Sequence, residues 1–379
     1  DRASVGPVRH GIEILKPLRR GNAQMTDQRE NDKNWVGRLY DWAGLSAPVG
    51  VILLVGFILV PALPGTFWTE VGTEVLILGL FAMSFNLIYG YMGQISFGHA
   101  AFFGLGAYAT AMLFRYFSGG TGDITTWQFF ITLLVGPPVA ALGSFIVGIF
   151  VVRLTGIYFA ILTLAFGELI FFIVFSWYSF TGGDDGIQRL LPPPIFRNAA
   201  VYYYFTLAIV ALATFIMWRI TRSPFGYMLR CMRENPLRTR FIGINIKMYM
   251  LVNFVVAGTF AGVAGSLWGP FTRSVGPLLL GWQEGGIAVF MTLIGGAGYF
   301  VGPFLGSIVY TFLHAYVTGF TVYWPLTIGV VILLIVIFSP GGLMGIIDAK
   351  IPQGWVGLGR KKEPSENLKR LKTEEETGD

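Results

Sequence analysis

Long apolar stretches alternate with short polar segments from residue 45 to residue 339. Ten such runs lie at residues 45–62, 71–90, 96–114, 128–152, 157–178, 201–218, 248–268, 284–298, 300–318 and 323–339. Runs of about 18 or more apolar residues are long enough to cross a bilayer as α-helices. The run at 284–298 is short for a hydrocarbon core of about 30 Å, so we expect a half-helix or a re-entrant segment there. The pattern predicts an all-α, polytopic transmembrane helix bundle of about ten spans.

Composition supports a bilayer environment for these helices. Of the 379 residues, 54% are hydrophobic and 13% are charged, about half the charged share of a soluble domain. The chain has 50 glycines, a residue common in membrane helices because it lets backbones approach closely. Gly258 with Gly262, and Gly298 with Gly302 and Gly306, have the four-residue spacing of such contacts. They predict close helix packing, or a surface along which helices slide.

Positive charge gathers in three segments outside the apolar runs: the N-terminal tail, residues 219–247 and the tail from Lys350. The positive-inside rule places all three in the cytoplasm. Six spans precede the central basic loop and four follow it. Because an even number of spans returns the chain to the same side of the membrane, the span count agrees with this placement. Topology therefore explains the net charge of +6 better than a nucleic-acid partner does. We expect a disordered cytoplasmic extension at 1–44, a transmembrane domain at 45–345 and a cytoplasmic tail at 346–379.

The central basic loop predicts a short helix after the break at Pro224. From Phe225 to Asn235 the sequence can form this helix, with Arg230 and Arg233 three residues apart on one face. A basic helix of this kind suits docking to another cytoplasmic protein. The alternative is a connecting loop whose arginines only hold it on the cytoplasmic side.

Polar residues within the apolar runs are candidates for function, because burying an ionisable group in hydrocarbon costs at least about 2.5 kcal/mol. Glu168 stands in the middle of one run and needs a hydrogen-bond partner, a proton or water. Gln94, Ser96 and His99 lie in a glycine-rich stretch that begins at Gly93. Together with Glu168 they form a candidate substrate path. The structural alternatives are that Ser96 caps the following helix, and that His99 and Glu168 are satisfied interior residues.

Two further glutamates, Glu74 and Glu284, fall near the outer ends of predicted spans, where they would reach water. Catalytic chemistry has little support elsewhere in the chain. The three histidines (His10, His99 and His314) lie far apart, and the single cysteine, Cys231, excludes an intramolecular disulfide. The phosphate-binding sequence Gly-x-x-x-x-Gly-Lys-Ser/Thr is absent. We expect no enzyme activity, metal or cofactor in this chain, so any ATP is used by partner subunits.

Six blocks of sequence, in order, resemble one known family. They are Phe85–Tyr108 (FNLIYGYMGQISFGHAAFFGLGAY), Gly156–Glu168 (GIYFAILTLAFGE), Thr181–Gly186 (TGGDDG), Arg233–Asn235 with Gly243–Asn245, Gly262–Gly265 with Gly295–Gly298 and Gly302–Pro303, and Ser339–Leu343 (SPGGL). The chain is similar, over about residues 70–345, to the LivM-type permease subunit of branched-chain amino acid ABC importers. That resemblance implies the permease fold of ABC importers in the inner, plasma membrane of a bacterial cell.

The resemblance also implies partners: a homologous second permease of the LivH type, two cytoplasmic ATPase subunits of the LivG/LivF type, and a periplasmic substrate-binding protein. It places the ATPase-coupling loop at Arg230, Arg233, Glu234, Asn235 and Gly243, although the Glu-Ala-Ala core of the wider importer motif is absent. Relatives carry branched-chain amino acids, urea, short amides or aromatic acids, and the sequence does not choose among them. The alternative function is an ion-coupled secondary transporter of a small organic solute, with Glu168 as its intramembrane carboxylate.

Overall fold

The computed structural model describes residues 50, 52–119, 123–320, 323–338 and 341–350. The extension expected at 1–44 and the tail beyond residue 350 lie outside the described residues. Helices account for the main elements of the described part, and its one sheet is a short antiparallel pair, β1 (Ile187–Gln188) with β2 (Ser274–Val275). The all-α prediction is therefore confirmed for the described residues.

Each predicted apolar run coincides with a helix. The first is helical over Ile52–Ala62, ending in η1 (Val60–Ala62). The others are α2 (Thr66–Asn86), α3 (Ala100–Ser118), α4 (Thr126–Val151), α5 (Ile157–Ser176), α7 (Ala199–Thr221), α10 (Ile246–Thr272), α11 (Trp282–Gly295), α12 (Gly302–Val317) and α13 (Trp324–Phe338). Shorter elements connect them: η2 (Leu87–Tyr91), α6 (Tyr178–Thr181), η3 (Gly183–Asp185), η4 (Pro194–Arg197), α8 (Pro224–Glu234), α9 (Pro236–Phe241), η5 (Pro277–Leu280) and α14 (Gly342–Lys350).

Among the described residues, five helices are long and apolar enough to cross a membrane. They are α2 continued through η2, then α4, α5, α7 and α10. Helix α11 has 14 residues, about 21 Å at 1.5 Å per residue, which is the length expected for a half-helix. The chain is thus a multi-pass membrane protein, while the number of about ten spans stays a prediction.

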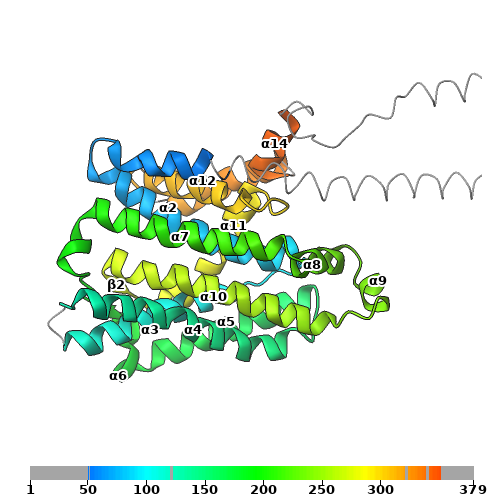
Figure 1. Ribbon diagram of the computed structural model, residues 1–379, viewed down its shortest axis with the longest axis horizontal. Helices are drawn as coiled ribbons and strands as arrows, with labels where there is room; N and C mark the ends of the chain where they lie inside the picture. Colours follow the sequence, from blue (N-terminus) through cyan, green and yellow to red (C-terminus); the bar gives the residue numbers. More distant parts are fainter. Residues whose placement is uncertain (1–49, 51, 120–122, 321–322, 339–340, 351–379) are drawn as a thin grey trace, which may run out of the picture. The chain divides into compact units, whose positions relative to one another are not determined.

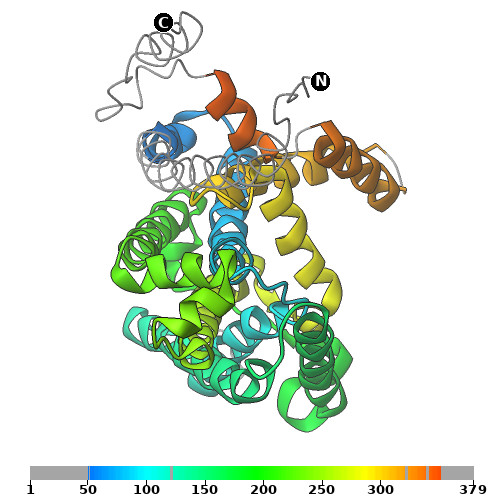
Figure 2. The ribbon, with the colours of Figure 1, turned by 90° about the vertical axis from the view of Figure 1, so that its right-hand side faces the viewer.

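Helix α2 lies at the centre of the helix packing. It contacts α7, α10, α11 and α12, and α10 packs in turn against α3 and α4. Figure 2 looks along the helices from the end that carries α8 and shows α2 surrounded by these neighbours. In the most apolar stretch of α2 94% of the residues are buried, against 28% in α5. Helix α5 therefore turns most of its apolar surface away from this chain.

Small residues set the closest helix contacts. A Cβ atom added at Gly262 of α10 would overlap the Ala140 side chain of α4, and one at Gly265 would overlap the backbone carbonyl of Phe103 on α3. The close packing predicted for Gly258 and Gly262 is confirmed. The second predicted ridge is partly wrong, because Gly298 precedes α12 (Gly302–Val317) and leaves only two of its three glycines on that helix.

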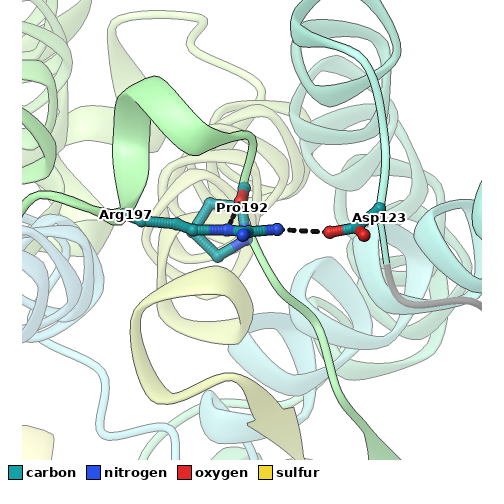
Figure 3. Close-up of polar contacts among 3 residues, drawn as sticks. All are labelled: Asp123, Pro192 and Arg197. Carbon is teal, nitrogen blue, oxygen red and sulfur yellow. Dashed lines mark hydrogen bonds and ion pairs between the residues drawn. The ribbon is translucent and has the colours of Figure 1, made fainter.

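The two ends of the bundle carry different connections. Figure 1 shows α8 and α9 at one end and α6 with β2 at the other. At the α6 end, Arg197 pairs with Asp123 and donates a 3.2 Å hydrogen bond from Nε to the Pro192 carbonyl oxygen (Figure 3). These contacts join the segment before α4 to the proline-rich segment before α7. At the end of the described chain, α14 was not predicted, and the domain boundary expected at residue 345 lies inside it.

Candidate functional site

Helix α8 forms where the sequence predicts a helix in the basic loop. Pro224 stands at its first turn, where the missing N–H of proline costs nothing. The helix ends at Glu234, and Asn235 starts α9 by accepting a 2.9 Å hydrogen bond at Oδ1 from the Arg238 amide. The sequence Glu-Asn-Pro thus separates two short helices. Asn235, expected in the coupling loop, has a clear structural role as a helix cap.

Both arginines of α8 contact this chain's own η2 turn. Arg230 is 8% exposed and its guanidinium carbon lies 4.8 Å from the centre of the Tyr91 ring, a cation–π contact. Arg233 donates a hydrogen bond from Nη1 to the Gly90 carbonyl oxygen. Their common face therefore holds α8 against the end of α2. Contact of these arginines with another protein stays a prediction.

The remaining expected coupling residues lie at the surface. Glu234 and Gly243 are exposed, and Gly243 has φ +87°, a left-handed conformation that favours glycine in the turn between α9 and α10. Sequence reasoning missed two apolar neighbours, Phe241 at 90% exposure and Ile242 at 79%. The signal available in the sequence was two adjacent large apolar residues directly after Arg238 and Arg240 in a basic loop.

The segment 94–99 contacts two helices through a polar side chain and closely packed glycines. Gln94 accepts a 2.7 Å hydrogen bond at Oε1 from the amide of Gly156, immediately before α5. Gly98 lies so close to the Thr163 carbonyl of α5 that a Cβ atom would overlap it, and Gly285 of α11 is equally close to the Phe97 carbonyl. The segment is therefore wedged between α5 and α11.

His99 and Ser96 are both fully buried. The Nε2 atom of His99 lies 2.9 Å from the hydroxyl oxygen of Ser84. The His99 ring stacks on Phe81, with the ring centres 5.6 Å apart. His99 is therefore an interior residue, as the structural alternative states, but only one of its ring nitrogens is satisfied, because Nδ1 has no hydrogen-bond partner among the described residues. The alternative of Ser96 as helix cap is wrong, because α3 begins at Ala100 with His99 at the cap position and no side-chain cap bond. Ser96 lies four residues before the start of α3, and its hydroxyl has no hydrogen-bond partner among the described residues.

Glu168 connects α5 to the start of the half-helix α11. Its Oε1 atom accepts a 3.1 Å hydrogen bond from the backbone amide of Trp282, the first residue of α11. The preceding Gly281 provides no side-chain cap, so the carboxylate supplies the acceptor and faces the positive end of the helix dipole. Of the four candidate path residues, Gln94 therefore contacts the start of α5 and Glu168 links α5 to α11. Ser96 and His99 are buried, and His99 packs against α2.

Two further glutamates lie on helices that pack against each other, which the sequence did not indicate. Glu74 belongs to α2 and Glu284 to the first turn of α11, and these two helices contact each other and α12. The expectation treated these glutamates as separate interfacial residues. The packing of α2 against α11 is a long-range contact without local sequence signal. Within the described ranges, no group of three or more His, Cys, Asp or Glu side chains is placed to hold a metal ion.

Comparison with known proteins identifies a family over most of the chain. Residues 69–339 match the family described as "Branched-chain amino acid transport system / permease component". The permease protein LivM of Escherichia coli K12, from a high-affinity branched-chain amino acid transport system, is 26% identical over 321 residues. That match covers 78% of this chain and 74% of the relative.

Two further relatives match over similar lengths. The probable LivM permease of Methanocaldococcus jannaschii is 26% identical, covering 69% of this chain and 89% of its own. The LivH permease of Escherichia coli K12 is 25% identical, covering 70% and 90%. No solved structure matches the chain.

Proposed function

Because the chain belongs to the family of permease components of branched-chain amino acid transport systems, we propose that it forms half of the pore of an ATP-driven importer for branched-chain amino acids. Relatives named LivM and LivH both match this chain, which supports a pore built from two homologous permeases. Two ATPase subunits in the cytoplasm hydrolyse ATP, and an external binding protein delivers substrate. About ten spans place both termini and the α8–α9 loop in the cytoplasm, following the distribution of basic residues.

The contact of α8 with η2 is the observation that carries this proposal. Arg230 and Arg233 tie α8 to Tyr91 and Gly90, so a displacement of α8 pulls on the end of α2. The opposite part of the loop exposes Phe241 and Ile242 to a partner. A coupling element requires one surface that binds a partner and another that contacts a transmembrane helix, and this loop has both.

The connection continues from η2 into the membrane. Three residues after Gly90, Gly93 has φ +75° and packs against the Arg233 side chain. Segment 94–99 follows directly and wedges between α5 and α11, where Glu168 holds the start of α11. Motion of α8 thus has a continuous path of packed backbone to these two helices.

Helix α5 is the wall that faces the second permease and the substrate in this proposal. Its side chains are the least buried of the five candidate spans, and Ile161, Leu169 and Phe172 are each more than half exposed. An apolar wall suits the side chains of leucine, isoleucine and valine. Tight binding there is unnecessary, since a conducting pathway must also release its substrate.

Replacing Arg233 in the reconstituted complex tests the coupling role. A hydrogen bond to a charged group contributes about 1.5 kcal/mol or more, so Arg233→Ala lowers amino acid uptake per ATP by about tenfold. The matched control is Arg115→Ala, which replaces an exposed arginine in the last turn of α3. We expect this variant to leave the ratio of uptake to ATP hydrolysis unchanged.

Two outcomes contradict the proposal. The first is an unchanged ratio of uptake to ATP hydrolysis in Arg233→Ala. The second is transport by this chain alone in liposomes under an ion gradient, which identifies an ion-coupled secondary transporter instead.

A further inference from the structure

An apolar groove runs along α7 on the side that meets the helical segment 52–62, α2 and the start of α12. It has a volume of about 320 Å³. Helix α7 lines it with a regular stripe: Leu207, Val210, Ala211, Thr214, Phe215 and Trp218. The stripe covers three turns, about 16 Å at 1.5 Å per residue. Since α7 is long and apolar enough to cross the bilayer, the groove follows the membrane normal.

The chemistry of the groove selects an apolar, elongated occupant. Thr214 carries the one hydroxyl group among the described lining residues, and this hydroxyl lies 4.0 Å from the Met83 sulfur. A lining of this kind offers water too few hydrogen-bond partners to hold it. Left empty, the groove loses the dispersion contacts that a packed interior provides. The acyl chains of the surrounding bilayer are apolar and have the same orientation as the groove.

One end of the groove carries positive charge. Trp218 closes the α7 stripe, and the guanidinium carbon of Arg222 lies 4.4 Å from the centre of its ring. Arg219 occupies the last turn of α7, and both arginines are exposed. Tryptophan and arginine at the end of a membrane helix lie at the level of the lipid headgroups. Arginine there binds phosphate oxygens with charge-assisted hydrogen bonds.

We propose that this groove binds one anionic phospholipid, with an acyl chain along the α7 stripe and the phosphate held by Arg222 and Arg219. Phosphates stand at both bilayer surfaces, so the site does not depend on which side of the membrane carries the end of α7. It is equally independent of the transported substrate. The arginines also have a structural role, because cations stabilise the C-terminal end of a helix, and the experiment separates the two roles.

Native mass spectrometry of the full chain, extracted from vesicles of phosphatidylglycerol and phosphatidylcholine, tests the site. We expect one phosphatidylglycerol retained per wild-type chain. Ala211→Trp fills the groove and abolishes retention, whereas Leu212→Trp, one residue along at a 61% exposed position outside the lining, retains lipid as the wild type does. Arg222→Gln lowers the preference for phosphatidylglycerol over phosphatidylcholine by about fivefold.

Three results overturn the proposal: a lipid-free wild type, equal retention in Ala211→Trp and Leu212→Trp, or an unchanged headgroup preference in Arg222→Gln. If Ala211→Trp fails to fold, Thr214→Trp is the second variant that fills the groove. A photo-crosslinker on Thr214→Cys, in a chain that also carries Cys231→Ser, identifies the occupant directly. Cross-links to phospholipid support the site, while cross-links to residues 1–49 or to another polypeptide refute it.

Discussion

The bond between Glu168 and Trp282 gives a quantitative prediction for the half-helix α11. Among the residues that the structure describes, the Glu168→Ala variant removes the only acceptor for the first amide of α11. Loss of a helix cap costs about 1 kcal/mol, and loss of a carboxylate facing a helix N-terminus adds about 0.5 kcal/mol at a partly buried position such as that of Glu168. The sum, about 1.5 kcal/mol, favours local opening of the start of α11 about tenfold. Glu168→Gln keeps the acceptor and loses the charge, so its effect is about twofold.

Hydrogen–deuterium exchange of a peptide covering residues 282–285 measures this opening. Exchange accelerates in the order wild type, Glu168→Gln, Glu168→Ala. Glu234→Ala, which removes an exposed carboxylate on α8, leaves the rate of this peptide unchanged. The reasoning fails if Glu168→Ala exchanges at the wild-type rate, or if Glu168→Gln and Glu168→Ala exchange equally fast, because the hydrogen bond then contributes nothing.

Three other substitutions have defined outcomes in thermal unfolding of the detergent-solubilised chain. Gly265→Ala forces a methyl group against the Phe103 carbonyl and destabilises the folded chain by about 1–3 kcal/mol. Its control, Gly286→Ala, has open space around the added methyl group and is neutral or slightly stabilising. Equal effects of the two substitutions would refute the packing argument. His99→Ala empties a fully buried aromatic position and costs about 3 kcal/mol; a cost under about 1 kcal/mol would contradict its structural role. Arg197→Gln breaks an exposed ion pair and costs under about 1 kcal/mol, so a larger loss would reveal an unrecognised contribution.

Local patterns predicted the helices, but the sequence did not predict which residues meet. The apolar runs and the break at Pro224 depend on neighbouring residues alone, and both recur in the structure. Gln94 with Gly156 and Glu168 with Trp282 are pairs separated by 62 and 114 residues, and their meeting depends on how whole helices pack. Charge was misleading in one respect. The arginines of the basic loop indicated a surface for a partner, but Arg230 is buried against its own chain.

Helix α2 does not simply stop where α8 holds it, because its last turn, η2, is a π-helix of five residues. Such a turn contains one residue more than an α-helical turn, and π-helical turns inside longer helices are frequent at functional sites. One residue corresponds to a rotation of about 100° around the helix axis. If η2 shortened to an α-helical turn, Gly93 and the segment after it would swing around α2 while the buried part of that helix stayed fixed. The contacts of α8 with Gly90 and Tyr91 therefore fall on η2. A displacement of α8 would act on the turn of α2 whose shortening by one residue would rotate the segment that follows.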